Sequence, residues 1–373
     1  MHCRGAKSNY YCSLHVVSSY VYSLAQGLRQ RSLFGGNSTV RSSRCPWHDE
    51  AYMARRADME IVAGAEYVPA RIADNHHFSQ LTGRSPEWFE RLTGIVARHR
   101  AAEGENANTM AVSAVRRLVE EPGDSLEGVD LVIGASCTPW DTVATIAHVI
   151  QRHFGLRGAR AIYLSTACSS FINALELAAV YFETKRARRA LIVVAEHMSL
   201  YSHDEDEQSG HLWGDAAVAL LVSADPVGSN GLTVIDIDTV GLADVGAGPS
   251  AVYMTPRDEG LVMPNGKDVF NHACREMENA ASGMLARHGL AVGRLRLLVP
   301  HQANQRIIDQ VSRRMGLEPR QMACTIRELG NTGSVSVPIT LLRCGEQLKA
   351  GDHSLLVTFG GGYSCGCALL QRR

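Results

Sequence analysis

The chain has 373 residues, of which 45% are hydrophobic, and its 37 basic and 38 acidic residues give a net charge of −1. A chain of this length can bury one large core or two fused ones, and a near-neutral charge gives no reason to expect nucleic acid or a membrane surface as its partner. No apolar run reaches the roughly 20 residues of a membrane-spanning helix. The ten scattered cysteines contain no CxxC pair, which favours a cytoplasmic protein with free thiols over a disulfide framework or a metal site.

Residues 1–57 differ from the rest of the chain. They are rich in Ser, Tyr and Arg, show no sustained hydrophobic period and contain a Gly-Gly-Asn-Ser break. We interpret them as a disordered N-terminal extension, or as the result of a start assigned upstream of Met53 or Met59. A signal peptide is a third interpretation, although polar residues interrupt its apolar part.

From residue 58 on, short β-rich runs alternate with helical patterns. In chain order, the periodicity predicts a strand at 59–65, helices at 86–92 and 108–120, a strand at 129–136, a helix at 142–153, a strand at 161–164, a helix at 168–185, strands at 190–195, 215–223 and 232–240, a helix at 267–288, a strand at 295–300, a helix at 303–315, a short extended run at 323–326, a helix at 334–348, and strands at 353–359 and 364–371.

The two halves of this pattern, 58–230 and 231–373, show the same order of elements. This order predicts a layered α/β fold built from a duplicated unit, with buried strands. No linker rich in Pro, Gly or Ser separates the halves, so we expect them to pack into one body.

Cys168 lies in the segment Ser165–Phe171, at the joint between a predicted strand and a predicted helix. Nearly every position from Phe171 to Phe182 is apolar, so we expect this helix to be buried on most sides. A cysteine as its first residue would meet unpaired N-terminal amides, which lower the pKa of a thiol and supply donors for an oxyanion. The alternative interpretation is a cysteine that only packs in the core.

Two further polar residues occupy comparable places. His301 follows the strand 295–300, and Asn331 follows the run 323–326. In open α/β sheets, ligands bind outside the carboxyl ends of strands, so we expect Cys168, His301 and Asn331 to meet. Each of them alone could equally be a cap or a loop residue.

Two glycine-containing segments complete the pattern. Gly360, Gly361 and Gly362 follow Phe359 at the end of a strand, where they let the backbone approach a ligand and present amides. The segment 213–217, Trp-Gly-Asp-Ala-Ala, is interpreted as a tight turn with small-residue packing.

Together these segments resemble the β-ketoacyl-acyl carrier protein synthase III group of thiolase-fold condensing enzymes. The resemblance runs from about residue 58 to the C-terminus and rests on the TACSS segment around Cys168, Pro300–Asn304, Gly330–Thr332, Gly214–Ala216, Phe359–Gly362, Glu87–Trp88, Thr93–Ile95 and Arg98–His99. It implies a thiolase-like fold, in which two similar halves form a layered αβαβα body, and a homodimer.

The resemblance also implies a chemistry for these residues. Cys168 would take an acyl group from a thioester donor, and malonyl-acyl carrier protein would lose carbon dioxide to give an enolate that attacks this acyl group. His301 and Asn331 would donate hydrogen bonds to the malonyl thioester oxygen, and the backbone amides of Cys168 and Gly361 would form a second oxyanion hole. Phe359 would be an apolar wall beside the departing carboxylate.

The implied partners follow from the same resemblance. Acyl carrier protein is acidic, and Arg306, Arg313 and Arg314 match the family's docking patch. Trp88 would lie at the substrate entrance. No metal and no cofactor beyond the thioester substrates are implied, and the pathway would be fatty acid biosynthesis or a polyketide route.

Several alternatives stay open. Leu92 stands where relatives that use acetyl-CoA carry an arginine, with Arg91 adjacent, so the donor can be CoA-bound or carrier-bound. The runs Trp140–Val143 and Ser209–Asp215 resemble specialised-metabolism members that make dialkylresorcinols or pyrones. Such an enzyme would couple a β-ketoacyl thioester with a second acyl chain. Other candidates are a thiolase whose second cysteine is Cys365 or Cys367, a hydroxymethylglutaryl-CoA synthase, and a non-catalytic partner subunit.

Overall fold

The structure is a computed structural model that describes residues 56–121, 125–225, 231–255 and 260–373. The chain divides into two units, Met1–Cys45 and Pro46–Arg373, and the description below concerns the second unit alone. The predicted extension, residues 1–57, lies outside the described residues except for Arg56 and Ala57, which open the first strand.

The centre of the fold is a nine-stranded sheet with the order β11-β12-β13-β8-β1-β7-β6-β4-β5. Its strands are β1 (Arg56–Tyr67), β4 (Leu131–Ala135), β5 (Arg160–Leu164), β6 (Arg189–Glu196), β7 (Ala216–Ser223), β8 (Leu232–Gly241), β11 (Leu295–Pro300), β12 (His353–Gly360) and β13 (Ser364–Arg372). All nine were predicted from the sequence within a few residues at each end.

The sheet contains the same unit twice. In one half, β4 is parallel to β6, β6 is antiparallel to β7, and β7 is antiparallel to β1. In the other half, β11 is parallel to β12, β12 is antiparallel to β13, and β13 is antiparallel to β8. An antiparallel pairing of β1 with β8 joins the halves. The predicted two similar halves are therefore confirmed, whereas the boundary at residue 230 stays a prediction.

The predicted extended run at 323–326 is not a strand. Met322, just before the run, makes one isolated bridge to Leu298, and the Ala323 amide donates to the Leu298 carbonyl (2.9 Å). The next amides, of Thr325 and Ile326, donate instead to the side-chain oxygen of Gln302. A side chain therefore takes the donors that a neighbouring strand would need.

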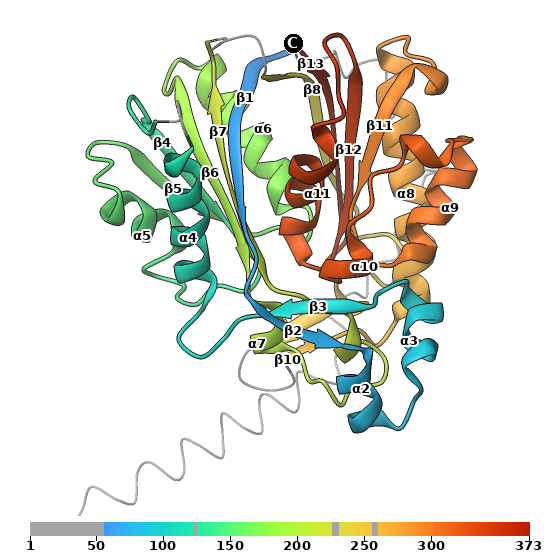
Figure 1. Cartoon of the computed structure of the whole chain (residues 1–373). Coiled ribbons are helices and arrows are strands. Elements are labelled where there is room, and N and C mark those ends of the chain that lie inside the picture. Colours follow the sequence, from blue (N-terminus) through green and yellow to red (C-terminus); the bar gives the residue numbers. More distant parts are fainter. Residues whose placement is uncertain (1–55, 122–124, 226–230, 256–259) are drawn as a thin grey trace, which may run out of the picture. The chain divides into compact units, whose positions relative to one another are not determined.

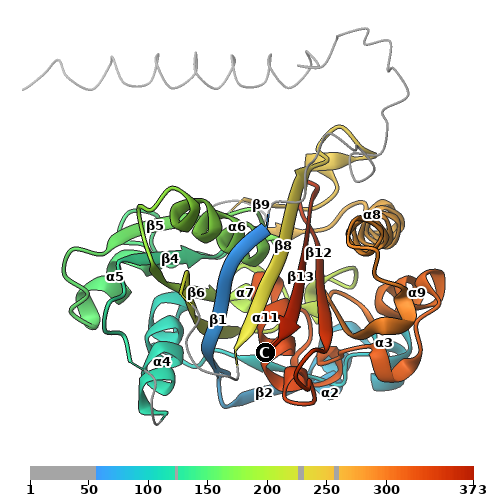
Figure 2. The ribbon, with the colours of Figure 1, turned by 90° about the horizontal axis from the view of Figure 1, so that it is seen from above.

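Helices lie on both sides of the sheet and between its halves (Figures 1 and 2). In Figure 1, α4 (Ala107–Glu120) and α5 (Ile146–His153) lie outside one half, and α8 (Gly266–Arg287) and α9 (Gln305–Met315) lie outside the other. Between the halves lie α6 (Ser170–Glu183) and α11 (Ser336–Gly345). This gives the expected αβαβα layering. Helix α5 begins four residues later than predicted, because Asp141 caps the preceding turn by accepting from the amides of Val143 and Ala144.

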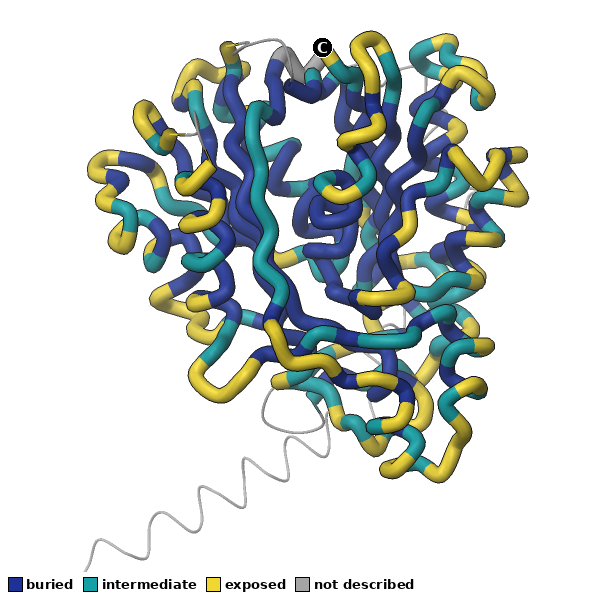
Figure 3. Tube along the Cα trace, viewed as in Figure 1, coloured by how far each residue is buried: buried dark blue, intermediate teal, exposed yellow. Residues whose placement is uncertain are grey.

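The largest core cluster surrounds the two central helices. It joins α6 and α11 to both halves of the sheet, and Figure 3 shows both helices among the buried segments. On α6, Phe171, Ile172, Ala174 and Leu175 are almost completely buried, which confirms the expected buried helix. Because burying one such large side chain is worth about 1.5–3 kcal/mol, α6 anchors the preceding segment, which carries Cys168, in a rigid part of the fold.

The remaining elements are short and were mostly not predicted. Helix α3 (Pro86–Thr93) was predicted. The others are β2 (Arg71–Asp74), α2 (Asn75–Thr82), β3 (Ala97–Arg100), α7 (Met198–Tyr201), β9 (Tyr253–Thr255), β10 (Gly260–Val262) and α10 (Ile326–Leu329). Single 3₁₀ turns lie at Gly210–Leu212, Gly248–Ser250, Val292–Arg294, Pro319–Gln321 and Gly333–Val335. Strands this short carry too few residues for a periodic signal. In the described part of the chain, no helix is both long and apolar enough to cross a membrane.

Candidate active site

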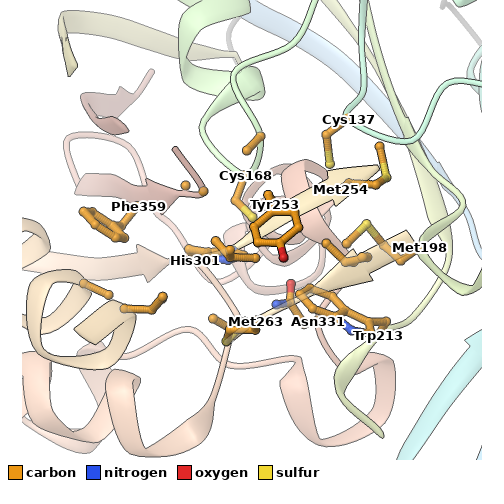
Figure 4. Close-up of a pocket in the computed structure, with 18 of the residues that line it drawn as sticks. Cys137, Cys168, Met198, Trp213, Tyr253, Met254, Met263, His301, Asn331 and Phe359 are labelled. Atoms are coloured by element: carbon orange, nitrogen blue, oxygen red, sulfur yellow. The ribbon is translucent and has the colours of Figure 1, made fainter. Parts of the chain in front are cut away.

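A single cavity brings the three predicted polar residues together. Cys168, His301 and Asn331 all line it, together with Phe359, Gly360 and Gly361, and its volume is about 810 Å³ with its open mouth included (Figure 4). Cys168 follows β5, His301 follows β11 and Gly360 ends β12. The three residues therefore meet as expected, but only Cys168 and His301 follow strands, whereas Asn331 follows the short helix α10.

The turn that carries Cys168 precedes the helix. Helix α6 begins at Ser170, so Cys168 lies two residues before it, and the expectation that it is the first helical residue is wrong. Ala167 has a φ of 50°, and the amides of Ser169 and Ser170 donate to the carbonyls of Thr166 and Ala167 (3.2 and 3.1 Å). This left-handed residue makes a separate tight turn, which delays the start of the helix.

Strand β12 packs directly on this turn. A Cβ atom on Gly360 would lie 3.0 Å from the backbone nitrogens of Cys168 and Ser169, and the Thr358 hydroxyl donates to the Cys168 carbonyl (3.0 Å). The amides of Gly361 and of Cys168 itself act on the Cys168 sulfur and favour its anion. These are the two amides expected to form an oxyanion hole, a role that stays a prediction.

Burial controls the protonation state of Cys168. It raises the pKa of the thiol to about 12, and the carboxylate of Glu196 adds to this rise, while the amides of Gly361 and Cys168 oppose it. The expectation that the helix N-terminus lowers the thiol pKa is therefore wrong, because desolvation outweighs the nearby amides. At neutral pH Cys168 is therefore a thiol and not a thiolate.

His301 is a neutral hydrogen-bond donor. Burial lowers the pKa of the imidazole to about 4, and Nδ1 lies 2.6 Å from the hydroxyl oxygen of Ser336. That oxygen also accepts from the Gln302 amide at 3.4 Å, so we assign the Ser336 proton to the bond with Nδ1. Nε2 then carries the imidazole hydrogen and can donate to a ligand.

The side chain of Asn331 is oriented by its own turn. The Gly333 amide donates to Oδ1 (3.0 Å), which leaves Nδ2 as a donor. Its backbone amide donates to the Leu212 carbonyl (2.8 Å), and its carbonyl accepts from the Gly214 amide (3.0 Å). A Cβ on Gly214 would collide with the Leu329 carbonyl. The segment interpreted as a plain turn is thus a backbone partner of Asn331.

Phe359 forms an apolar wall of the cavity. Its side chain is buried, and its ring centre lies 4.9 Å from that of Tyr363. The Tyr363 hydroxyl donates to Asp268 Oδ2 (2.6 Å). Tyr363 has a left-handed φ of 58°, so this bond fixes a residue whose backbone conformation is uncommon without glycine. Phe359 therefore packs against a tyrosine whose position is fixed by the bond to Asp268.

The rest of the lining was missed by sequence reasoning. Figure 4 shows Cys137, Met254, Met198 and Trp213 together on one side of Cys168 and Phe359 on the other. Met263 and Met277 also line the cavity. Most of these residues come from loops or from the short β9–β10 pair, so no periodic pattern could have revealed them. Methionines adapt to ligands of irregular shape.

Cys365 and Cys367 do not supply the second cysteine of a thiolase. Cys365 and Cys367 are completely buried on β13, as expected for packing residues, and neither lines the cavity. A thiolase-type second cysteine is therefore not found at these two positions. Among the described residues, no group of three or more His, Cys, Asp and Glu side chains is placed to hold a metal ion.

Trp88 lies apart from the cavity lining. Its ring packs against Phe89 and His211, with ring centres 5.0 and 5.9 Å away, and the guanidinium of Arg84 lies 5.3 Å above it. Trp88 does not contact the cavity that holds Cys168. Its role at a substrate entrance stays a prediction.

The three arginines expected at a docking patch lie on α9. Arg306, Arg313 and Arg314 are exposed, and Arg314 forms a 3.1 Å ion pair with Glu278 of α8. Arg306 precedes Ile307, which lines the cavity, so the patch begins beside the site. Two of its charges, those of Arg306 and Arg313, form no ion pair with an acidic side chain in the described residues.

His211 makes the stability of the fold sensitive to acid. It is buried against Phe89, and burial and then Arg98 lower its pKa to about 4, whereas the unfolded value is about 6.5. As pH falls from about 6.5 towards 4, the unfolded chain gains a proton that the folded protein does not, so stability is lost. Between pH 7 and pH 4.5, we expect the free energy of unfolding of His211→Phe to fall by about 2–3 kcal/mol less than that of the wild type.

Denaturant unfolding at both pH values measures this difference. His153→Phe, at an exposed histidine, is the matched control and should keep the wild-type loss. An acid loss in His211→Phe as large as that of the wild type would contradict the prediction.

Comparison with known proteins locates these residues within two matched regions. Residues 163–241 match the family "3-Oxoacyl-[acyl-carrier-protein (ACP)] synthase III", and residues 285–372 match its C-terminal counterpart. The first region contains Cys168, and the second contains His301, Asn331 and Phe359.

Whole proteins are similar over most of the chain. The β-ketoacyl-[acyl-carrier-protein] synthase III of Nitratidesulfovibrio vulgaris is 33% identical over 317 residues, which cover 82% of this chain and 96% of that protein. The crystal structure of 3-oxoacyl-[acyl-carrier-protein] synthase III from Aquifex aeolicus is similar with a TM-score of 0.77 and 28% identity, covering 84% of this chain and 99% of that one. The priming β-ketosynthase of the R1128 polyketide pathway is similar with a TM-score of 0.77 and 29% identity, covering 89% and 99%.

Proposed function

The chain belongs to the β-ketoacyl-[acyl-carrier-protein] synthase III family, and on this basis we propose that the cavity around Cys168 is its active site. The protein is an acyltransferase that forms a carbon–carbon bond by Claisen condensation of an acyl group with malonyl-acyl carrier protein, releasing carbon dioxide and a 3-oxoacyl product. One observation carries the assignment of the site: a thiol, a neutral histidine and an oriented amide line a single cavity.

In the first half-reaction, Cys168 accepts the acyl group. Its sulfur bonds to the carbonyl carbon of the thioester donor, and the donor's carbon–sulfur bond breaks. The thiol proton of Cys168 leaves with the donor's sulfur. The amides of Cys168 and Gly361, which already act on the sulfur, hold the oxyanion of the tetrahedral intermediate.

In the second half-reaction, malonyl-acyl carrier protein enters and its carboxylate leaves as carbon dioxide. The electron pair of the broken carbon–carbon bond forms an enolate, whose oxygen accepts hydrogen bonds from His301 Nε2 and Asn331 Nδ2. The enolate carbon then attacks the acyl group and expels the Cys168 thiolate. The low pKa of His301 keeps the imidazole neutral, so Nε2–H donates a hydrogen bond and does not protonate the enolate, and the apolar Phe359 favours a neutral leaving group.

Carbon dioxide release distinguishes this reaction from its alternative, the coupling of a β-ketoacyl thioester with a second acyl chain. The purified protein is incubated with malonyl-acyl carrier protein and a series of acyl-CoA and acyl-carrier donors. We expect carbon dioxide and a 3-oxoacyl carrier protein, identified by mass spectrometry. No release with any donor would overturn the proposed reaction, and product from a β-ketoacyl thioester without release would favour the alternative.

We propose that α9 docks the acyl carrier protein. Arg306→Glu with Arg313→Glu should raise KM for malonyl-acyl carrier protein by about tenfold or more, because it places like charges at the interface. The same double substitution should change KM little for a malonyl thioester of a small thiol, which does not contact α9. Arg116→Glu, at an exposed arginine of α4 on the opposite outer layer, is the matched control. An equal effect of both variants would contradict docking at α9, as would an effect that persists at high salt.

We also propose a homodimer formed at β5. This strand ends the sheet order, so one of its edges pairs with no strand of the described residues, and Val180 on α6, the helix that follows β5 in the chain, is 39% exposed. Exposed edges of this kind pair with other chains. Light scattering should give about twice the chain mass of 40.5 kDa, and the mass of a single chain would contradict this.

Two further expectations belong to the same proposal. We propose that the reaction uses thioester substrates and no cofactor, and that the protein acts in the cytoplasm. The described cysteines are all free, which supports a reducing compartment, and Cys168 must remain a thiol to react.

A further inference from the structure

Glu196 is a buried acid that the reaction above does not use. It ends β6 and is completely buried. Five donors surround its carboxylate: the amides of Cys137 and Thr138 and the hydroxyls of Ser136, Thr138 and Ser334. A carboxylate that accepts this many hydrogen bonds is rigidly held, and each of its donors is held in turn.

These donors belong to opposite halves of the chain. Ser136, Cys137 and Thr138 follow β4, and Cys137 and Thr138 line the cavity. Ser334 belongs to the single 3₁₀ turn Gly333–Val335, which begins two residues after Asn331. The Glu196 carboxylate therefore ties a wall of the cavity to the turn that carries Asn331.

The same turn orients the amide of Asn331. The Gly333 amide donates to Asn331 Oδ1 (3.0 Å), and Gly333 has a left-handed φ of 57°. A Cβ at Gly333 would lie 3.3 Å from Glu196 Cγ, so the turn rests on the side chain of Glu196. A shift of Glu196 would move Gly333, and with it the direction in which Asn331 Nδ2 points.

We propose that Glu196 is a positioning residue for the second half-reaction, in which its carboxylate holds the Ser334–Gly333 turn so that Asn331 Nδ2 faces the malonyl thioester oxygen. This rests on the function proposed above. The first half-reaction uses Cys168 and Gly361, neither of which is among the described hydrogen-bond partners of Glu196, so the two half-reactions should respond differently to its loss.

Whereas the hydrogen bonds of Glu196 support the second half-reaction, its negative charge disfavours the thiolate of Cys168. It raises the pKa of the thiol, and it would also oppose the negative charge of an enolate nearby. Glu196→Gln keeps the shape but removes the charge. It should therefore make Cys168 easier to ionise while it weakens the support of Asn331.

The experiment measures three quantities in the full-length protein carrying Glu196→Gln. Malonyl-acyl carrier protein decarboxylation should lose about 10- to 100-fold in kcat, the cost of a small misplacement, with KM near the wild-type value. Acylation of Cys168, followed by intact mass, should not fall. The pH midpoint for alkylation of Cys168 by iodoacetamide should move to lower pH.

Two variants, each of which deletes one hydroxyl that donates to Glu196, distinguish the contact on the Asn331 side from the contact on the β4 side. Ser334→Ala removes the bond on the Asn331 side and should reproduce part of the loss in decarboxylation. Ser136→Ala removes a bond to the same carboxylate on the β4 side and should decarboxylate at nearly the wild-type rate. This pair remains informative even where Glu196→Gln fails to fold.

Specific outcomes overturn the proposal. Equal losses in both half-reactions of Glu196→Gln would indicate general damage, and equal effects of Ser334→Ala and Ser136→Ala would exclude a specific route to Asn331. Wild-type decarboxylation in all three variants would also overturn it. If the wild-type protein itself releases no carbon dioxide, the proposed function fails, which is a different result.

Discussion

Cys168→Ala is expected to abolish acyl transfer to the protein and to lower condensation by about 10⁴-fold or more, as removal of a nucleophile does in other covalent catalysts. The substitution deletes one sulfur atom that borders an open cavity, so the fold should be nearly as stable as before. His301 and Asn331 are unchanged, and decarboxylation of malonyl-acyl carrier protein can therefore persist. Intact mass spectrometry after exposure to acyl thioesters measures the adduct directly.

The cavity offers a matched control for this experiment. Cys137 also lines it, and burial and then Glu196 raise the pKa of its thiol. Cys137→Ala should keep the acyl adduct. An adduct on Cys168→Ala, or its loss in Cys137→Ala, would reassign the nucleophile. The absence of an adduct on the wild-type protein with every donor would favour the non-catalytic partner subunit.

Loss of either enolate donor is expected to cost about 10²- to 10³-fold in decarboxylation, the usual cost of one oxyanion-hole donor. Asn331→Asp is the sharper variant, because Oδ1 can still accept from the Gly333 amide while the donor is replaced by a second acceptor. His301→Ala removes the other donor. Acylation of Cys168 should continue in both, so single-turnover measurements of the two half-reactions provide the test.

The pH profile adds an independent check. Because the pKa of His301 is lowered to about 4, the imidazole stays neutral from about pH 5 upward, and its titration should leave no step in the wild-type rate near pH 6.5. A step near pH 6.5 that disappears in His301→Ala would show a solvated imidazole instead. A decarboxylation rate that is unchanged in Asn331→Asp would remove Asn331 from the mechanism.

The sequence by itself determined the features that depend on neighbouring residues. The apolar run from Phe171 to Phe182 predicted a buried helix, and the repeated order of strands and helices predicted two similar halves. The segments around Cys168, His301 and Asn331 identified the family, because each carries its chemistry within a few residues. These signals are local, so periodicity and motif spacing reveal them.

Only the tertiary structure decided the environment of these residues. The thiol pKa of Cys168 rises instead of falling, because the fold buries it near Glu196, which is 28 residues away in the sequence. The amides at 325 and 326 turn to Gln302 instead of forming a strand, and Ser334 reaches Glu196 across the two halves. Desolvation and long-range hydrogen bonds depend on which distant side chains the fold brings together, and no local pattern encodes that.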